Sequence, residues 1–174
     1  MTADQVFNQV LPEAYKLLPA SMNSPEASVM LLAIGLQESR FASRRQLVNS
    51  INSEGRKVLL PLGPAKGYWQ MEKGGAVKGL LNFWKPATKE LVHSVCKARG
   101  VLATQDAVWD ALEHDDVLAC ALARILLYTD PHRLPPIKAQ AEAWDLYLRQ
   151  WRPGQPHEAT WPELYRKAVR VVTQ

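Results

Sequence analysis

An apolar run that ends abruptly in a carboxylic acid is the feature that most constrains this chain. Almost every residue from 27 to 36 is apolar, and Glu38 follows two positions later. A helix that is apolar on all sides packs in the middle of a domain. Ser24-Pro25 supplies an N-cap and a proline suited to the first helical position. The pattern predicts a central helix over Pro25–Ser39 whose end carries Glu38. On this run alone, the simpler interpretation is that Glu38 is the first solvated residue after a buried segment.

Length and composition indicate one mainly α-helical domain over residues 1–174. The chain is 47% hydrophobic and 22% charged, which excludes disordered, collagen-like and coiled-coil proteins. Its longest apolar run is shorter than the roughly 20 residues of a membrane span. The first residues lack a secretory signal, so we expect synthesis in the cytoplasm and free thiols at Cys96 and Cys120. The four histidines are scattered, and we expect neither a metal nor another cofactor.

Helical patterns flank a polar segment of different character. We expect a long irregular loop over residues 40–67, in which only Val58-Leu59-Leu60 resembles a strand and a short β-hairpin has room to form. Loops of this length tend to be functional, but an exposed, solvated insertion is the alternative. Thr104 and Thr160 are the expected N-caps of later helices, the second as part of a capping box with Glu163. The helices are expected over 3–18, 76–83, 87–99, 105–113, 115–128, 137–151 and 162–172.

A second motif, rich in glycine and aromatic residues, closes this loop at Gly63-Pro64-Ala65-Lys66-Gly67-Tyr68-Trp69-Gln70. Glycine lets the backbone approach a ligand closely, and an aromatic ring offers a flat apolar face to a sugar or a base. We therefore expect Gln70 and Trp69 to approach Glu38, with one of the two aromatic rings facing a sugar and the other entering the core. The alternative is that Tyr68 and Trp69 are core anchors of a tight turn.

Two of these segments resemble the lysozyme-like domain of lytic transglycosylases and goose-type lysozymes. Glu38-Ser39-Arg40-Phe41 is similar to the Glu-Ser pair and nearby aromatic residue of that family. Its second motif, Gly-Ala-x-Gly-Leu-Met-Gln, is matched by Ala65, Gly67 and Gln70. The third motif, Ala-Tyr-Asn, has a loose counterpart in Ala143-Trp144-Asp145. The resemblance implies a lysozyme-like fold with a small irregular lobe, a peptidoglycan glycan strand as substrate, and a phage or prophage origin, with a virion or a holin bringing the enzyme to the cell wall.

The chemistry of glycosidic bond cleavage suits a glutamate in this position. The reaction needs a carboxyl that is still protonated near neutral pH, beside the bridging oxygen. Burial and the helix C-terminus should raise the pKa of Glu38, whereas Arg40 and Arg44 should lower it. A lytic transglycosylase, as the resemblance implies, needs this one carboxyl only. A hydrolase needs a second one, for which Glu72 and Glu54 are the candidates.

The remaining residues of the expected site would bind the substrate. Trp144, Tyr147 and Trp151 form a helical stripe that is either core packing or a wall for sugar rings. Basic side chains of the loop, Arg44, Lys57 and Lys66 among them, are expected to line the groove beside Glu38 and attract the carboxylates of murein. The full set of expected substrate-binding residues is Ser39, Gly67, Tyr68, Trp69, Gln70, Trp144 and Tyr147.

Two other classes of function compete with the enzyme. The first is a catalytically silent lysozyme-like or helical module, serving as a phage structural protein or as a glycan-binding module. The second is nucleic-acid binding through the basic residues of segment 40–66. We do not expect nucleic-acid binding, because the net charge of +4 is mild and no recognition motif is present. The oligomeric state is left open.

Overall fold

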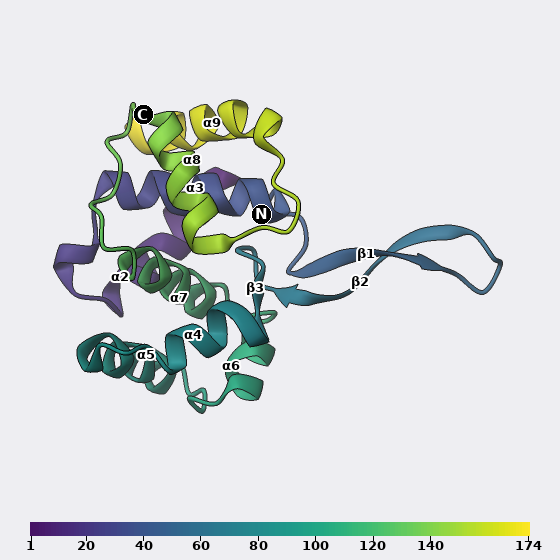
Figure 1. The fold of residues 1–174 in the computed structure, drawn as a ribbon, viewed down its shortest axis with the longest axis horizontal. Helices are drawn as coiled ribbons and strands as arrows, with labels where there is room; N and C mark the ends of the chain where they lie inside the picture. The colour runs from purple at the N-terminus through teal and green to yellow at the C-terminus, as the bar shows by residue number, and fades with distance from the viewer.

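The computed structural model describes all 174 residues as a mainly helical domain with one small antiparallel sheet, and its central helix is the predicted one (Figure 1). This helix, α3, spans Pro25–Ser39, and the Ser24 hydroxyl accepts a hydrogen bond from the backbone N–H of Ala27. Residues 27–36 are all buried. The helix ends at Arg40, which takes a left-handed conformation with φ 54°. The helix thus continues for three residues beyond the buried run, and Glu38 lies in this last stretch.

The N-terminal helix contains an irregular turn that the sequence pattern did not predict. It consists of α1 (Ala3–Gln5), a π-helical segment (Val6–Val10) and α2 (Leu11–Lys16). Pro12 has no N–H to donate, and in a regular α-helix its ring would clash with the carbonyl of Asn8. The wider π turn accommodates the proline without ending the helix.

The later helices form close to their predicted positions, with two differences at their starts. Thr104 caps its helix as predicted, by accepting a hydrogen bond from Ala107 N–H. The capping box predicted at Thr160 is wrong, because this backbone is helical and the hydroxyl bonds Gln37 and the His157 carbonyl instead. The start predicted at residue 137 moves to Gln140. The helices are α4 (Lys78–Leu81), α5 (Pro86–Ala98), α6 (Gln105–Ala111), α7 (Asp116–Tyr128), α8 (Gln140–Trp151) and α9 (Trp161–Thr173), with a π-helical segment at Lys73–Val77 before α4.

The β-hairpin for which residues 40–67 had room does form, but it is longer and more regular than the predicted irregular loop with a short hairpin. Strand β1 (Arg45–Ile51) pairs antiparallel with β2 (Lys57–Lys66), and β2 pairs with the short β3 (Met71–Glu72). At the tip, the Asn52 side chain accepts hydrogen bonds from two backbone N–H groups, which closes the turn. The hairpin projects away from the helices (Figure 1). The prolines of β2 concealed the strand, because proline is tolerated in a β-sheet only at edges and irregularities.

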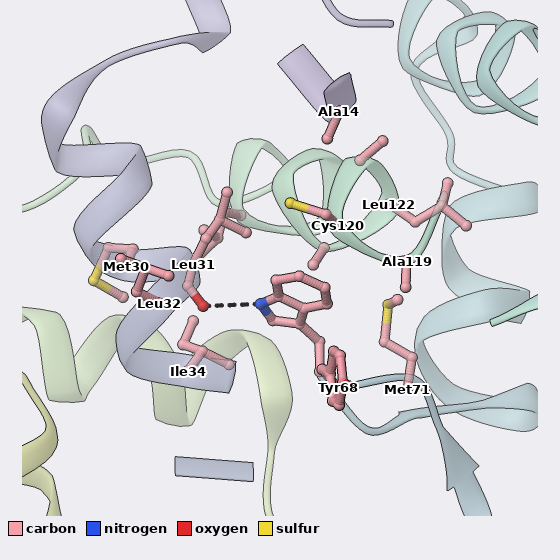
Figure 2. Close-up of a cluster of buried hydrophobic side chains, with 14 of the residues drawn as sticks. Ala14, Met30, Leu31, Leu32, Ile34, Tyr68, Met71, Ala119, Cys120 and Leu122 are labelled. Atoms are coloured by element: carbon pink, nitrogen blue, oxygen red, sulfur yellow. Dashed lines mark hydrogen bonds between the residues drawn. The ribbon is translucent and has the colours of Figure 1, made fainter. Parts of the chain in front are cut away.

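A single hydrophobic core of 42 buried residues draws on the N-terminal helix, on α3 and on the helices from α4 to α9. Trp69 lies inside it, and its indole N–H donates a hydrogen bond of 2.8 Å to the Leu31 carbonyl of α3. Figure 2 shows this bond as a dashed line, with Met71, Ala119 and Cys120 around it. The turn that carries the second motif is therefore anchored directly to the central helix. No helix is both long and apolar enough to span a membrane.

Candidate active site

A groove with a volume of about 1190 Å³ runs between the sheet and the C-terminal ends of the long helices. The end of α3 and the ends of α7 and α8 form one side, and the segment from Gln70 to Phe83 forms much of the other. The loop after α8 closes one end, where Gln37 Nε2 donates a hydrogen bond to the His157 carbonyl at 3.0 Å. Glu38 and Glu72 both line this groove.

Glu38 lies in the last turn of α3 and lines the groove, as the sequence pattern predicted for a helix-end carboxyl. The hydroxyl of Tyr147, on α8, donates a hydrogen bond of 2.7 Å to Glu38 Oε1. Tyr147, one of the expected substrate-binding residues, lines the groove and is also the direct hydrogen-bond partner of Glu38. The bond holds one carboxyl oxygen in place.

The environment of Glu38 raises the pKa of its carboxyl to about 7. Burial is the largest cause, because it disfavours the charged form. The hydrogen bond from Tyr147 acts in the opposite direction, and the negative charge of Glu72 raises the pKa further. Arg44 does not contribute, since its guanidinium forms a bidentate ion pair with Asp116 at 2.7–2.8 Å. Glu38 can therefore both give and take a proton near neutral pH.

The structure separates the two candidates for a second carboxylate. Glu72 ends β3 and lines the same groove as Glu38. Glu54 lies in the exposed turn at the tip of the hairpin, where it pairs with Arg56 at 3.3 Å. Of these two glutamates, only Glu72 lines the groove together with Glu38.

Ser39 and Gly67 have structural roles that bring the two motifs together. The Ser39 hydroxyl donates a hydrogen bond of 2.8 Å to the Tyr68 carbonyl, which joins the end of α3 to the second motif. Gly67 has φ +73°, a conformation that favours glycine, and a Cβ there would lie 3.0 Å from the Leu112 carbonyl oxygen. Neither residue lines the groove.

Gln70 is brought to the groove as predicted. Its backbone takes φ 49°, and its side-chain Nε2 donates a hydrogen bond of 2.8 Å to the Gly67 carbonyl. Gln70 and Glu38 line the same groove although 32 positions separate them in the sequence (70 − 38). The turn of the second motif therefore folds back toward the end of α3.

The aromatic residues expected to contact a sugar lie mainly in the core, which corrects that expectation. Trp69 is 0% exposed and Tyr68 is 2% exposed, so neither ring faces the groove. Trp144 is also buried and packs against Tyr147 and Trp161. The alternative interpretation, in which these rings anchor a turn and pack between helices, describes them correctly.

The basic residues expected to line the groove lie elsewhere, which is a second correction. Lys66 is 3% exposed and forms ion pairs with Asp110 at 2.7 Å and Glu113 at 3.1 Å. It therefore links the end of β2 to α6 and to the residues directly after this helix. Arg44 is held by Asp116, and Lys57 lies on the outer part of the hairpin. None of the three lines the groove. Their charges stabilise the packing of the sheet or face solvent.

Several groove residues were missed by sequence analysis because they carry no local signal. Amide side chains recur along the walls, and the segment after α8 contributes its backbone and side chains. Trp151 was noted only as part of a helical stripe, yet it lines the groove and its indole N–H donates to the Trp69 carbonyl at 2.8 Å. No group of three or more His, Cys, Asp or Glu side chains is arranged to hold a metal ion. The missed residues include Gln37, Gln46, Thr129, Gln150, Arg152, Gln155 and His157.

The chain matches no protein-family model, no curated protein and no solved structure.

Proposed function

We propose that the protein cleaves glycosidic bonds of peptidoglycan, with Glu38 as general acid and base. The observation that carries the proposal is a carboxyl with a pKa of about 7 that lines a large groove and is held by Tyr147. A protonated carboxyl beside the bridging oxygen is what departure of the leaving sugar requires. The resemblance of the two short motifs to lytic transglycosylases and goose-type lysozymes points to the same reaction.

The lining of the groove suits a carbohydrate. Its walls carry the amides of Gln37, Gln70, Gln150 and Gln155. An amide has two N–H donors and two acceptor lone pairs, so even Gln37 and Gln150, whose oxygen and nitrogen atoms already bond other groups of the protein, keep capacity for sugar hydroxyls. The volume of about 1190 Å³ exceeds the roughly 300–1,000 Å³ that is usual for small-molecule sites, so the groove has room for an oligomeric ligand. These features support a polysaccharide substrate over a nucleotide.

The reaction would begin with proton transfer from Glu38 to the bridging oxygen as the bond between this oxygen and the anomeric carbon breaks. The anomeric carbon then carries positive charge in an oxocarbenium-like transition state. In a transglycosylase the ionised Glu38 takes the proton of the sugar 6-hydroxyl, which closes a ring on the anomeric carbon. In a hydrolase a water molecule attacks instead, and Glu72 is the groove carboxylate placed to assist it.

The decisive test is Glu38→Gln, which keeps the shape of the side chain and removes its transferable proton. We expect murein cleavage to fall by at least about 10²- to 10⁴-fold, the usual contribution of general acid–base catalysis. Glu54→Gln is the matched control, because it makes the same chemical change on the hairpin tip and should leave activity unchanged. Cleavage that persists undiminished in a folded Glu38→Gln protein would reject the proposal. A wild-type protein without activity would favour a catalytically silent module.

Product analysis and Glu72→Gln separate the two forms of the reaction. Anhydro-muramoyl products identify a transglycosylase, and reducing ends identify a hydrolase. In a hydrolase that uses Glu72 to activate water, Glu72→Gln should lower activity by about 10²-fold or more. In a transglycosylase the same substitution should change mainly the pH dependence, because removing the charge of Glu72 lowers the pKa of Glu38.

A further inference from the structure

A second cavity, with a volume of about 910 Å³, lies beside a buried arginine that has no acidic partner. The arginine is Arg124 of α7, and only 5% of it is exposed. The cavity opens between α5, the C-terminal half of α7 and the segments 19–24 and 130–134. None of the catalytic candidates lines it, and Phe83 is the one residue that it shares with the groove of Glu38.

The hydrogen-bonding capacity of Arg124 is largely unused. Its Nε donates to the Met22 carbonyl at 2.8 Å, whereas Nη1 is buried without a partner. No carboxylate of the chain forms an ion pair with the guanidinium. Burial also holds the pKa of Arg124 below its ordinary value. A buried charge without a partner destabilises a protein, and folded proteins usually satisfy such groups with a counter-ion.

The acids nearest to this cavity do not supply that counter-ion. Asp130 is bound by Arg149 at 2.9 Å, by Gln150 at 3.0 Å and by His132 at 2.8 Å. Its carboxylate is fully engaged, and these bonds hold its pKa well below the ordinary range. Glu90 is exposed on α5 and would weakly repel an anion. Two exposed cationic residues that line the same cavity, Lys85 and Arg133, would weakly attract an anion.

One part of the lining is suited to an apolar group. Met22, Phe83, Leu91, Leu127 and Leu134 contribute hydrophobic side chains around the position of Arg124. A cavity of this kind stabilises a ligand by burying apolar surface, while a few polar groups fix its orientation. We propose that this cavity binds an organic anion, a carboxylate or phosphate monoester on an apolar body, with Arg124 as its counter-ion.

Calorimetric titration of the wild-type protein tests the charge requirement without any substitution. The probes are octanoate, octyl phosphate and the uncharged 1-octanol, which share one apolar chain. We expect at least one of the two anions to bind about 10- to 100-fold more tightly than octanol, as hydrogen bonds to a buried charge imply. The tighter of the two identifies the head group. Equal binding of all three, or no binding, would overturn the proposal.

Two variants with the same change of charge locate the site. Arg124→Gln should weaken binding of the preferred anion by about 10- to 100-fold and leave octanol binding unchanged. Arg133→Gln, at the exposed rim, should weaken it by less than about 5-fold. An equal loss in both variants would mean general electrostatic attraction and would reject the assignment of Arg124.

A third variant keeps the proposal testable if Arg124→Gln does not fold. Ser94 is exposed on α5 and lines the cavity, so Ser94→Trp should obstruct it while leaving Arg124 intact. We expect anion binding to be lost in this variant, with an unchanged melting temperature. Binding at the wild-type affinity would place the anion outside the cavity.

Discussion

Glu38 has two neighbours that shift the pKa of its carboxyl in opposite directions. Tyr147 donates a hydrogen bond that stabilises the ionised form, and Glu72 carries a negative charge that destabilises it. Burial exceeds the effect of Tyr147, so the pKa lies at about 7. The substitutions Tyr147→Phe and Glu72→Gln should therefore move this pKa in opposite directions.

Tyr147→Phe removes the hydroxyl while keeping the ring in its aromatic stack. We expect the pKa of Glu38 to rise above 7, because the ionised carboxyl loses its donor. Carbon-13 NMR titration of the Glu38 carboxyl measures this shift without relying on activity. Tyr165→Phe is the control, because its hydroxyl bonds the Ile137 carbonyl and not Glu38. A lower pKa in Tyr147→Phe would contradict the geometry.

The raised pKa of Glu38 should also make the free energy of unfolding depend on pH. The folded carboxyl has a pKa of about 7 against an ordinary value of 4.5, so the native state binds more protons between these values. The free energy of unfolding of the wild-type protein should fall by about 3 kcal/mol in all as the pH rises from 4.5 to about 7. Below pH 4.5, Glu38 is protonated in both states and should not affect this free energy. Glu38→Gln lacks this penalty and should be the more stable protein at about pH 8. Urea unfolding at about pH 8 and pH 4 measures the difference, and a less stable variant at about pH 8 would contradict the pKa.

At the scale of elements, the β1–β2 hairpin is the part that contributes least to the core. Leu47, Ile51 and Leu59 are 48%, 69% and 61% exposed, and the strands project away from the helices (Figure 1). Isolated two-stranded hairpins are at best marginally stable in water. Its outer half should therefore add little to the free energy of unfolding of the domain.

Shortening the hairpin tests this conclusion. Val48 pairs with Leu60, so residues 49–59 can be replaced by the two-residue turn Asn-Gly. We expect the melting temperature to change by less than about 2 °C, as for a surface change outside the core. Murein cleavage should be retained, because the groove residues Gln46 and Leu47 remain. A large loss of stability would show that the outer strands support the fold.

At the scale of the whole molecule, Trp69 connects three parts of the structure. Its indole N–H binds the Leu31 carbonyl of α3, and its own carbonyl accepts a hydrogen bond from Trp151 of α8. The turn that carries Gln70 is thereby held between the two helices that bear Glu38 and Tyr147. The geometry of the candidate site depends on this buried junction, of which Figure 2 shows the hydrogen bond to Leu31.

Trp69→Phe should weaken the junction without removing its aromatic character. The lost hydrogen bond and the cavity left behind should lower the free energy of unfolding by about 2 kcal/mol and the melting temperature by about 4–8 °C. Trp84→Phe is the matched control, because Trp84 is 76% exposed and should change stability by less than about 0.5 kcal/mol. Thermal unfolding of both variants measures the contrast. Equal effects would show that Trp69 has no special role.

The sequence alone was sufficient for the elements that depend on neighbouring residues. The apolar run and Ser24-Pro25 predicted the bounds of α3, and the position of Glu38 at its end followed from those bounds. Thr104 acts as the N-cap that the sequence predicted, at the point where the helical pattern begins. These features could be read from the sequence because helix periodicity and capping involve residues only a few positions apart.

Tertiary structure alone decided which side chains meet at the groove. Tyr147 and Glu38 are 109 positions apart, and no local pattern relates them. Glu72 and Glu54 are equivalent as carboxylates, and only the path of the hairpin places one in the groove and the other at its tip. Tyr68 and Trp69 are aromatic residues of the kind that contact sugar rings, yet both are buried in the core. The physical reason is that burial and long-range contacts depend on how all the elements pack together, whereas a sequence pattern reports only on the element that contains it.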